Sequence, residues 1–122
     1  MSEIEKLYAN VGVEKEYEYV GHYPKTDENG IILPMVYPPF TAEKQLELIK
    51  WLAEFSDFGS FSPDVEINKD TKVKEYGFAF IKRGKRHYYI DTKFEIALAK
   101  CFNNLWQDLT EVERQQIKAI LQ

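Results

Sequence analysis

A cluster of basic side chains is the part of this sequence whose residue types could do chemistry. Its members lie within six consecutive positions, and they are Lys82, Arg83, Lys85, Arg86 and His87. Aromatic residues stand on both sides, with Phe80 before the cluster and Tyr89 after it. Cationic side chains interleaved with aromatic rings can hold a phosphate backbone and stack bases, as in proteins that bind single-stranded nucleic acids.

The rest of the chain does not extend this basic cluster into a larger surface. The 122 residues include 16 Lys and Arg against 20 Asp and Glu, which gives a formal net charge of -4. A nucleic-acid footprint normally covers a face of the protein rather than one loop. We therefore interpret the basic cluster first as a solvated turn, and keep nucleic-acid binding as the alternative.

No other group of residues forms a recognisable catalytic or metal-binding set. His22 and His87 are the only histidines, and neither belongs to the three or four spaced ligands that a metal site requires. Glu14, Glu16 and Glu18 alternate with other residues, as on the solvated face of a strand. The sequence therefore predicts no enzyme, no cofactor and no metal site.

The cysteine content and the hydropathy pattern both favour a cytoplasmic protein. Cys101 is the only cysteine, which excludes an internal disulfide, and its position on an apolar helical face predicts a buried, unreactive thiol. No apolar run approaches the ~20 residues that span a bilayer, and the first residues lack the pattern of a signal peptide. We expect no membrane association.

The basic cluster lies at the tip of a predicted β-hairpin over residues 78 to 90. A two-residue turn at Gly84 and Lys85 would place Arg83 opposite Arg86. One face of the hairpin would then carry Ala79, Ile81, Tyr88 and Ile90, and the other Phe78, Phe80, His87 and Tyr89. Because both faces are apolar or aromatic, we expect helices on both sides of the sheet, the alternative being one face kept for a partner.

Capping signals and apolar spacing predict four helices around this hairpin. Three capping boxes, which mark helix starts, are formed by Ser2 with Glu5, Thr92 with Glu95, and Thr110 with Glu113. They predict a short first helix that Gly12 stops, a helix over residues 92 to 109, and a separate final helix. Thr41 caps a further helix over residues 42 to 55, whose apolar stripe consists of Leu48, Leu52 and Phe55 with Leu46 and Ile49 beside them.

The remaining segments are predicted to be less regular. Residues 17 to 37 form an irregular hairpin around Asn29-Gly30, the dipeptide most typical of a tight β-turn. The loop that follows the second helix carries Phe58 and Phe61, which we expect to be tucked beneath it, although they could also contact a partner. They complete the candidate binding residues.

Together these elements predict a single α+β domain over residues 1 to 122, with a small, mainly antiparallel sheet packed by helices. Its core is a helix, hairpin, helix and helix over residues 37 to 122, and residues 1 to 36 add the N-terminal helix and irregular hairpin. Two stretches of the sequence carry a resemblance to a known group of proteins. The first is Tyr37-Pro38-Pro39-Phe40-Thr41, which precedes the 42 to 55 helix. The second is Phe94-Glu95-Ile96-Ala97-Leu98-Ala99, which leads into Asn104-Leu105-Trp106-Gln107-Asp108-Leu109-Thr110. Over residues 37 to 122 the chain resembles small phage and prophage proteins of Gram-positive bacteria, some of which are grouped as phage α-β-α sandwich proteins.

The resemblance implies a phage accessory protein that acts by binding, with no site residues to transfer. We expect the partner to be a host or defence protein, so that the protein would act in the bacterial cytoplasm as an inhibitor resembling anti-CRISPR proteins. One alternative is a nucleic-acid-binding module that uses residues 82 to 87. Another is a small-molecule binder whose pocket lies between the aromatic face of the hairpin and the 42 to 55 helix.

Overall fold

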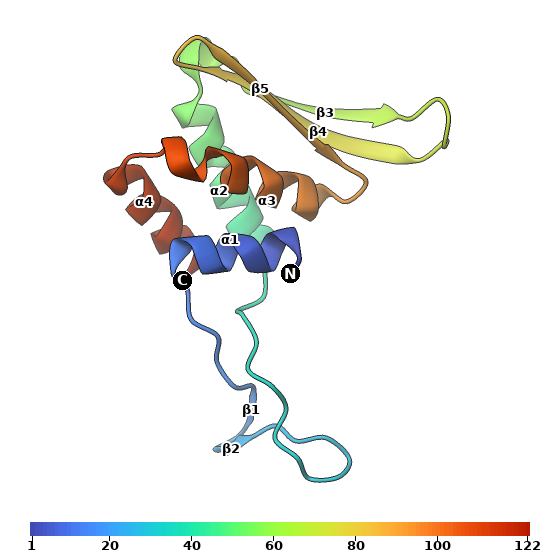
Figure 1. Ribbon diagram of the computed structural model, residues 1–122, viewed down its shortest axis with the longest axis vertical. Coiled ribbons are helices and arrows are strands. Elements are labelled where there is room, and N and C mark those ends of the chain that lie inside the picture. The colour runs from blue at the N-terminus through green and yellow to red at the C-terminus, as the bar shows by residue number, and fades with distance from the viewer.

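The computed structural model describes all 122 residues and places helix α3 at the centre of the fold (Figure 1). The helices are α1 (Glu3–Val11), α2 (Ala42–Phe55), α3 (Phe94–Leu105) and α4 (Glu111–Leu121), with short 3-10 turns η1 (Asp57–Gly59) and η2 (Trp106–Asp108). The strands are β1 (Tyr19–Val20), β2 (Tyr23–Pro24), β3 (Ser62–Ile67), β4 (Lys74–Lys82) and β5 (Lys85–Asp91). An α+β fold is thereby confirmed, and none of the helices has the length and hydropathy needed to cross a membrane.

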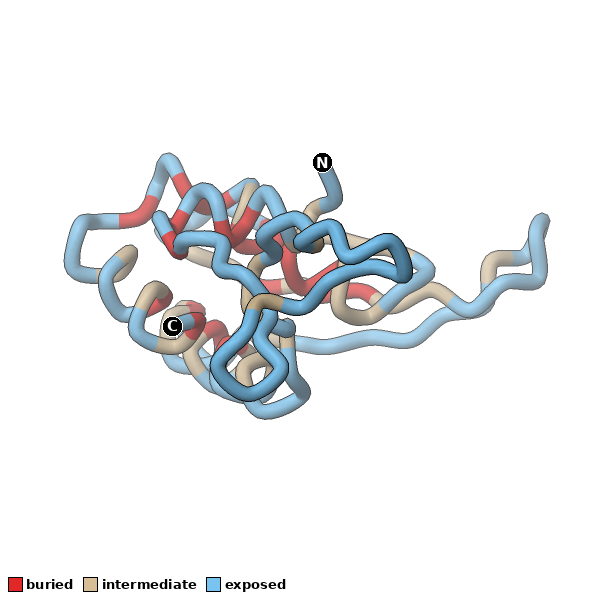
Figure 2. Tube along the Cα trace, turned by 90° about the horizontal axis from the view of Figure 1, so that it is seen from below, coloured by how far each residue is buried: buried red, intermediate tan, exposed pale blue.

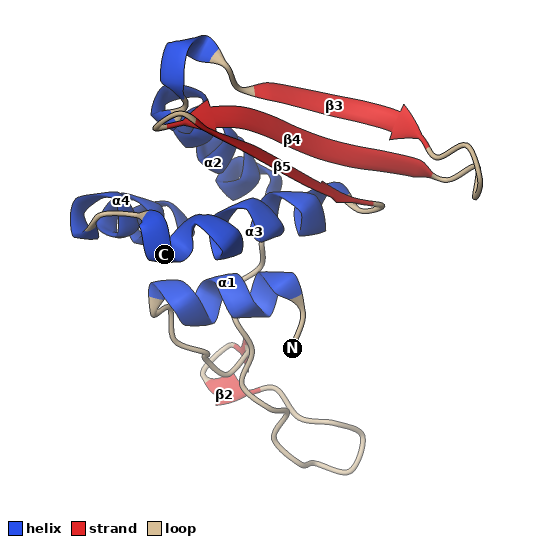
Figure 3. Ribbon diagram, turned by 45° about the horizontal axis from the view of Figure 1, so that its top comes forward, coloured by secondary structure: helices blue, strands red, loops and turns tan.

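Helix α3 packs against α1 on one side and against the β3-β4-β5 sheet on the other (Figures 1 and 3). Its apolar residues therefore meet neighbours nearly all round, and those that are fully buried are Ala97, Leu98, Ala99, Cys101, Phe102 and Leu105. Burial of apolar surface around this helix is the main source of stability in the fold.

Local capping fixes the start of three helices where the sequence predicts it. At α1 and α4, the Ser2 and Thr110 side chains accept from the backbone three residues on, and a glutamate returns the bond. Gly12 ends α1 in the left-handed conformation, with φ 79°. Helix α2 spans the predicted residues 42 to 55 and is capped by Thr41, whose side chain accepts from Lys44.

The predicted start of α3 is wrong by about two residues. Thr92 does not cap the helix, because β5 continues through Asp91 and the cap position falls on Lys93. The Asp91 carboxylate accepts from the Lys93 backbone at 3.1 Å and pairs with Lys100 at 2.7 Å, which holds the turn from strand to helix, and no side chain caps α3. The α-helix also ends early, at Leu105, and continues to Asp108 as the 3-10 turn η2.

The hairpin turn lies one residue earlier than the sequence predicts. Arg83 and Gly84 form the two-residue turn, with φ 52° and 76°, and Lys82 stands opposite Lys85. Tight hairpin turns of this kind need positive φ at both central positions, and the Asp57 carboxylate fixes Arg83 by accepting from its backbone at 2.6 Å. Moving the turn by one residue changes the partner of each β5 residue by two positions along β4. Because side chains alternate between the two faces with a period of two, each residue stays on its predicted face, and the predicted division between the faces is confirmed.

Helices cover only one face of the three-stranded sheet (Figure 3). On the inner face Phe78 and Phe80 pack against the helices and are buried, whereas on the outer face Tyr88 is half exposed. The expectation that helices lie on both sides is wrong, because α1 stacks behind α3 instead of crossing to the far side of the sheet. The molecule therefore has an uncovered outer sheet face.

Residues 14 to 36 form an arm that projects away from the helices (Figure 1), and in Figure 2, where the arm comes toward the viewer, it is pale blue or tan throughout. The two sides of the arm are joined by the β1-β2 pair and by bridges between Glu16 and Val36 and between Thr26 and Ile32. The turn between them ends at Gly30, where the Asp27 carboxylate accepts from the backbone of Asn29 and Ile31. The irregular hairpin is confirmed, but no residue of the arm is buried.

Candidate protein-binding surfaces

Two of the five residues of the basic cluster, Lys82 and Arg83, bind neighbouring groups of the fold. The Lys82 ammonium lies 2.7 Å from the Phe55 carbonyl oxygen and 3.4 Å from the Asp57 carboxylate, and the Arg83 guanidinium reaches the Asp108 carbonyl oxygen at 3.4 Å. The side chains of Lys85 and Arg86 make no hydrogen bond or ion pair. Two of the four cations are therefore free to bind a ligand at the tip.

We expect the two halves of the tip to respond differently to substitution. Lys82→Ser should lower the free energy of unfolding by about 1 to 2 kcal/mol, because it leaves the Phe55 carbonyl and the Asp57 carboxylate without their cation. The double change Lys85→Ser with Arg86→Ser should stay within about 0.5 kcal/mol of the wild type. Denaturant melts test this, and equal losses in the two variants would show that the Lys82 contacts contribute nothing.

The fifth member of the cluster, His87, points into the fold instead of out from the tip. Its ring is 8% exposed, stacks on Phe80 with centroids 4.8 Å apart, and places Nδ1 3.0 Å from the Tyr89 hydroxyl. Burial lowers the pKa of His87 below 6.5, and the nearby Lys85 lowers it further, while Asp108 opposes them. The fold therefore favours the neutral imidazole.

This lowered pKa predicts that part of the stability is lost on mild acidification. Above pH 6.5 the imidazole is neutral in both states, so the stacked ring contributes fully. As the pH falls below 6.5 and through the lower pKa of the folded state, the unfolded chain binds the proton more readily and stability declines. Wild type should thus lose stability relative to His87→Gln as the pH falls through 6.5, whereas parallel pH profiles would contradict this.

The expectation that both loop aromatics are tucked beneath the loop is confirmed for Phe61 and wrong for Phe58. Phe61 stacks on Phe78 with ring centroids 6.0 Å apart, as the tucked arrangement predicts. Phe58 is fully exposed and adopts a left-handed backbone conformation, with φ 55°. Because a phenylalanine at positive φ is uncommon, and this ring packs against nothing, Phe58 is exposed beside the tip at a cost in backbone strain.

The space between the aromatic face of the sheet and α2 is largely filled. Phe80 packs edge-on against Phe55 with centroids 6.3 Å apart, which closes most of the predicted small-molecule pocket. A hollow of about 240 Å³ remains near the tip, bordered by Phe55, Lys82 and Leu105 among others. Ligand pockets usually hold about 300 to 1,000 Å³, so this hollow gives little support to the small-molecule alternative.

The arm carries the largest concentration of exposed apolar side chains. Of the sixteen large hydrophobic residues that are exposed in the structure, eight lie in the arm, each 42% to 78% exposed. They are Tyr17, Tyr19, Val20, Tyr23, Ile31, Ile32, Met35 and Val36. Exposed apolar surface gathered in one place is typical of a binding site. We call these eight residues the apolar arm surface.

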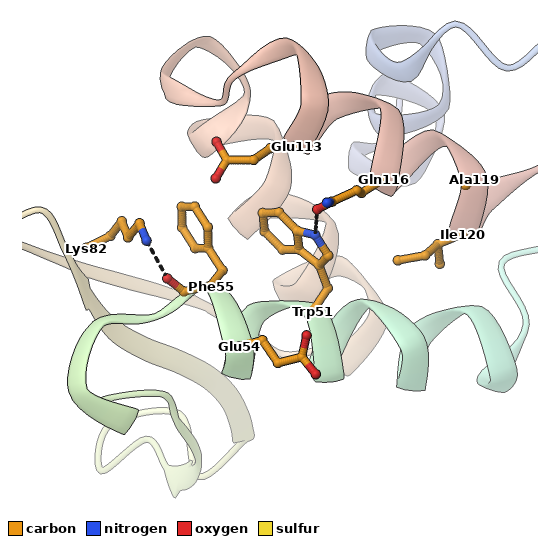
Figure 4. A pocket seen from close by; sticks show the side chains of 8 residues that line it. All are labelled: Trp51, Glu54, Phe55, Lys82, Glu113, Gln116, Ala119 and Ile120. Carbon is orange, nitrogen blue, oxygen red and sulfur yellow. Dashed lines mark hydrogen bonds between the residues drawn. The ribbon is translucent and has the colours of Figure 1, made fainter.

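A groove between α2 and α4 is the second candidate binding surface (Figure 4). Its floor carries the stacked rings of Trp51 and Phe55, with centroids 4.7 Å apart, and its far wall includes Ile120. The Trp51 indole donates to the Gln116 side chain at 2.8 Å, which joins the two helices across the groove. We call this feature the α2-α4 groove.

Comparison with known proteins identifies no relative for the chain. No protein-family model matches it, and neither a curated protein nor a solved structure matches it significantly. Of the predicted site residues, the structure exposes Arg83, Lys85, Arg86 and Phe58, while the arm and the groove were not predicted as sites.

Proposed function

We propose that the protein acts by binding another protein, and that the apolar arm surface is the main contact. The observation that carries this proposal is that eight large apolar side chains extend from the body with none of them buried. A standard interface takes about 800 Å² from each partner, and eight side chains that are each more than two-fifths exposed can supply an area of that order. Tyrosines, which are enriched at interfaces, make up three of the eight.

The class of partner rests on the resemblance of residues 37 to 122 to phage and prophage proteins. That resemblance favours an accessory protein that occupies a host or defence protein in the bacterial cytoplasm, with no catalytic step. Such a function requires only a complementary surface. The arm would supply it on a body whose own core is closed around α3.

The proposal is tested by capturing the partner with arm and body variants. The arm variant combines Tyr19→Ser, Tyr23→Ser and Ile31→Ser, and the matched control combines Leu46→Ser with Val112→Ser, which are exposed apolar positions on the body. A bacterial partner is captured on wild type, identified, purified and titrated against each variant. We expect the arm variant to bind at least about 100-fold more weakly and the control to bind like wild type.

Both variants should melt like the wild type, because the replaced side chains are largely exposed. A partner that binds the arm variant as tightly as wild type would overturn the role of the arm. The finding that wild type captures no protein, or captures only nucleic acid, would overturn protein binding itself.

A nucleic-acid ligand remains the second candidate because two cations at the hairpin tip make no hydrogen bond or ion pair within the protein. Lys85 and Arg86 are unpaired, and Phe58 is exposed on the η1 turn that packs against β4 beside the hairpin turn. This combination can contact a phosphate backbone and stack one base. Binding of single-stranded DNA that weakens steeply with salt, and that is lost in Lys85→Ser with Arg86→Ser, would establish this function instead.

A further inference from the structure

The α2-α4 groove is longer than the part drawn in Figure 4. A hollow of about 580 Å³ around Trp51 and Phe55 adjoins a second of about 550 Å³ nearer the start of α2, and the two share Ala119 and Ile120. Helix α2 has 14 residues, so a groove along it extends for about 20 Å. The groove thus has roughly the length of one medium helix, and its apolar side chains, Trp51, Phe55, Ala119 and Ile120, lie in and beside the hollow around Trp51.

The rim of the groove is acidic. Glu43, Glu47 and Glu54 border it from α2, where their spacing of four and seven residues places them on one side of the helix. Glu113 borders it from α4. Four carboxylates therefore surround a floor made of aromatic and aliphatic side chains.

The lysines near the groove leave much of this negative charge uncompensated. Lys82 pairs with Asp57, and the Lys44 ammonium lies over the Tyr8 ring at 5.7 Å. Lys50 pairs with Glu47 at 3.3 Å, so Glu47 alone among the rim carboxylates has a cationic partner. Glu43, Glu54 and Glu113 have none, which leaves the rim able to accept cations from outside.

We propose that the α2-α4 groove binds a basic amphipathic helix of a partner protein. The apolar side chains of that helix lie on Trp51, Phe55 and Ile120, and its lysine or arginine side chains face the rim carboxylates. A helix fits because the groove runs between two helices, and apolar anchors spaced by three and four residues match such a floor. The charges set the orientation and exclude acidic helices. The groove and the arm are separate surfaces, so this proposal does not rest on the arm.

The test uses the full chain and two synthetic peptides. Each peptide is a 14-residue helix former with leucine on one face, flanked by lysine in one and by glutamate in the other. Peptide is added to ¹⁵N-labelled protein, and the indole N–H resonance of Trp51, assigned from a Trp51→Phe variant, reports the groove directly because that group donates to Gln116. We expect the lysine peptide to shift this resonance and the glutamate peptide to leave it unchanged.

Charge variants then test the rim. Glu43→Lys with Glu54→Lys should weaken binding of the lysine peptide by about tenfold or more. The matched control is Glu14→Lys with Glu28→Lys on the arm, which changes the net charge from -4 to 0 in the same way, since each substitution adds two units. The control should bind like wild type. If the groove variant does not fold, Glu43→Gln with Glu54→Gln should give a smaller loss in the same direction.

Three results would overturn the proposal. The lysine peptide could fail to bind at millimolar concentration, or shift resonances of the arm or the outer sheet face while that of Trp51 stays fixed. The glutamate peptide could bind as tightly as the lysine peptide. The arm control could lose as much affinity for the lysine peptide as the groove variant, which would show that the net charge alone causes the loss.

Discussion

Tyr8→Ala should lower the free energy of unfolding by about 3 to 5 kcal/mol, as expected for removal of a buried aromatic ring. Tyr8 is fully buried, stacks on Tyr37 with centroids 5.4 Å apart, and meets Phe40 edge-on at 6.3 Å. Its hydroxyl donates to the Pro39 carbonyl oxygen at 3.3 Å. The ring therefore joins α1 to the segment that returns from the arm, and its loss leaves a cavity between them.

Tyr8→Phe separates the ring from its hydroxyl. Only the 3.3 Å hydrogen bond is removed, so denaturant melts should show a loss of about 1 kcal/mol or less. Burial raises the pKa of Tyr8 to about 12, so spectroscopic titration should find a tyrosine that ionises near pH 12 in wild type and is missing in the Phe variant. If the free energy of unfolding of Tyr8→Ala were within about 1 kcal/mol of the wild-type value, the ring would not anchor α1 to residues 37 to 40.

Leu105→Ala should lower the free energy of unfolding by about 2 to 5 kcal/mol, through lost burial and a new cavity. Leu105 is 1% exposed and occupies the last position of α3, where the helix gives way to η2. Because the start of the 3-10 turn packs on the same core, the cavity cannot collapse without moving η2 as well.

Leu46→Ala is the matched control for this substitution. The sequence places Leu46 in the apolar stripe of α2, but the structure leaves it 51% exposed, so we expect a loss within about 0.5 kcal/mol. Urea or guanidinium melts of the two variants measure both losses in the free energy of unfolding. A change under half a kilocalorie for Leu105→Ala would mean that this face of α3 is not core.

Helix starts were predictable where the stabilising contacts are local. Thr41 caps α2 through a bond to Lys44, and Thr110 caps α4 through reciprocal bonds with Glu113, so each signal lies within four residues. Thr92 shows the limit of such signals. Strand β5 continues through Asp91, whose carboxylate is held by Lys100 nine residues away, so α3 starts after Thr92 and has no side-chain cap, which the capping-box pattern does not reveal.

The features that matter most for binding depend on contacts between distant residues. The turn position is fixed by Asp57, which lies 26 residues from Arg83, and His87 is buried only because the sheet folds against the helices. The arm was predicted as a hairpin. Ile31 and Ile32 are exposed because no helix or sheet of the body packs against them, and the spacing of apolar residues in the sequence does not show this. The α2-α4 groove likewise depends on how two helices 56 residues apart at their closest ends come together.

The pairing of α1 with α3 sets the order in which the chain can fold. The Asn103 side chain donates to the Glu3 backbone and carboxylate at 2.9 and 2.8 Å, across 100 residues of sequence. At about 5 to 20 residues per second of synthesis, the first helix would wait roughly 5 to 20 seconds for this partner to be made. The apolar side of α1 lacks its α3 partner during that interval, so the docking of α1 is a late event in folding.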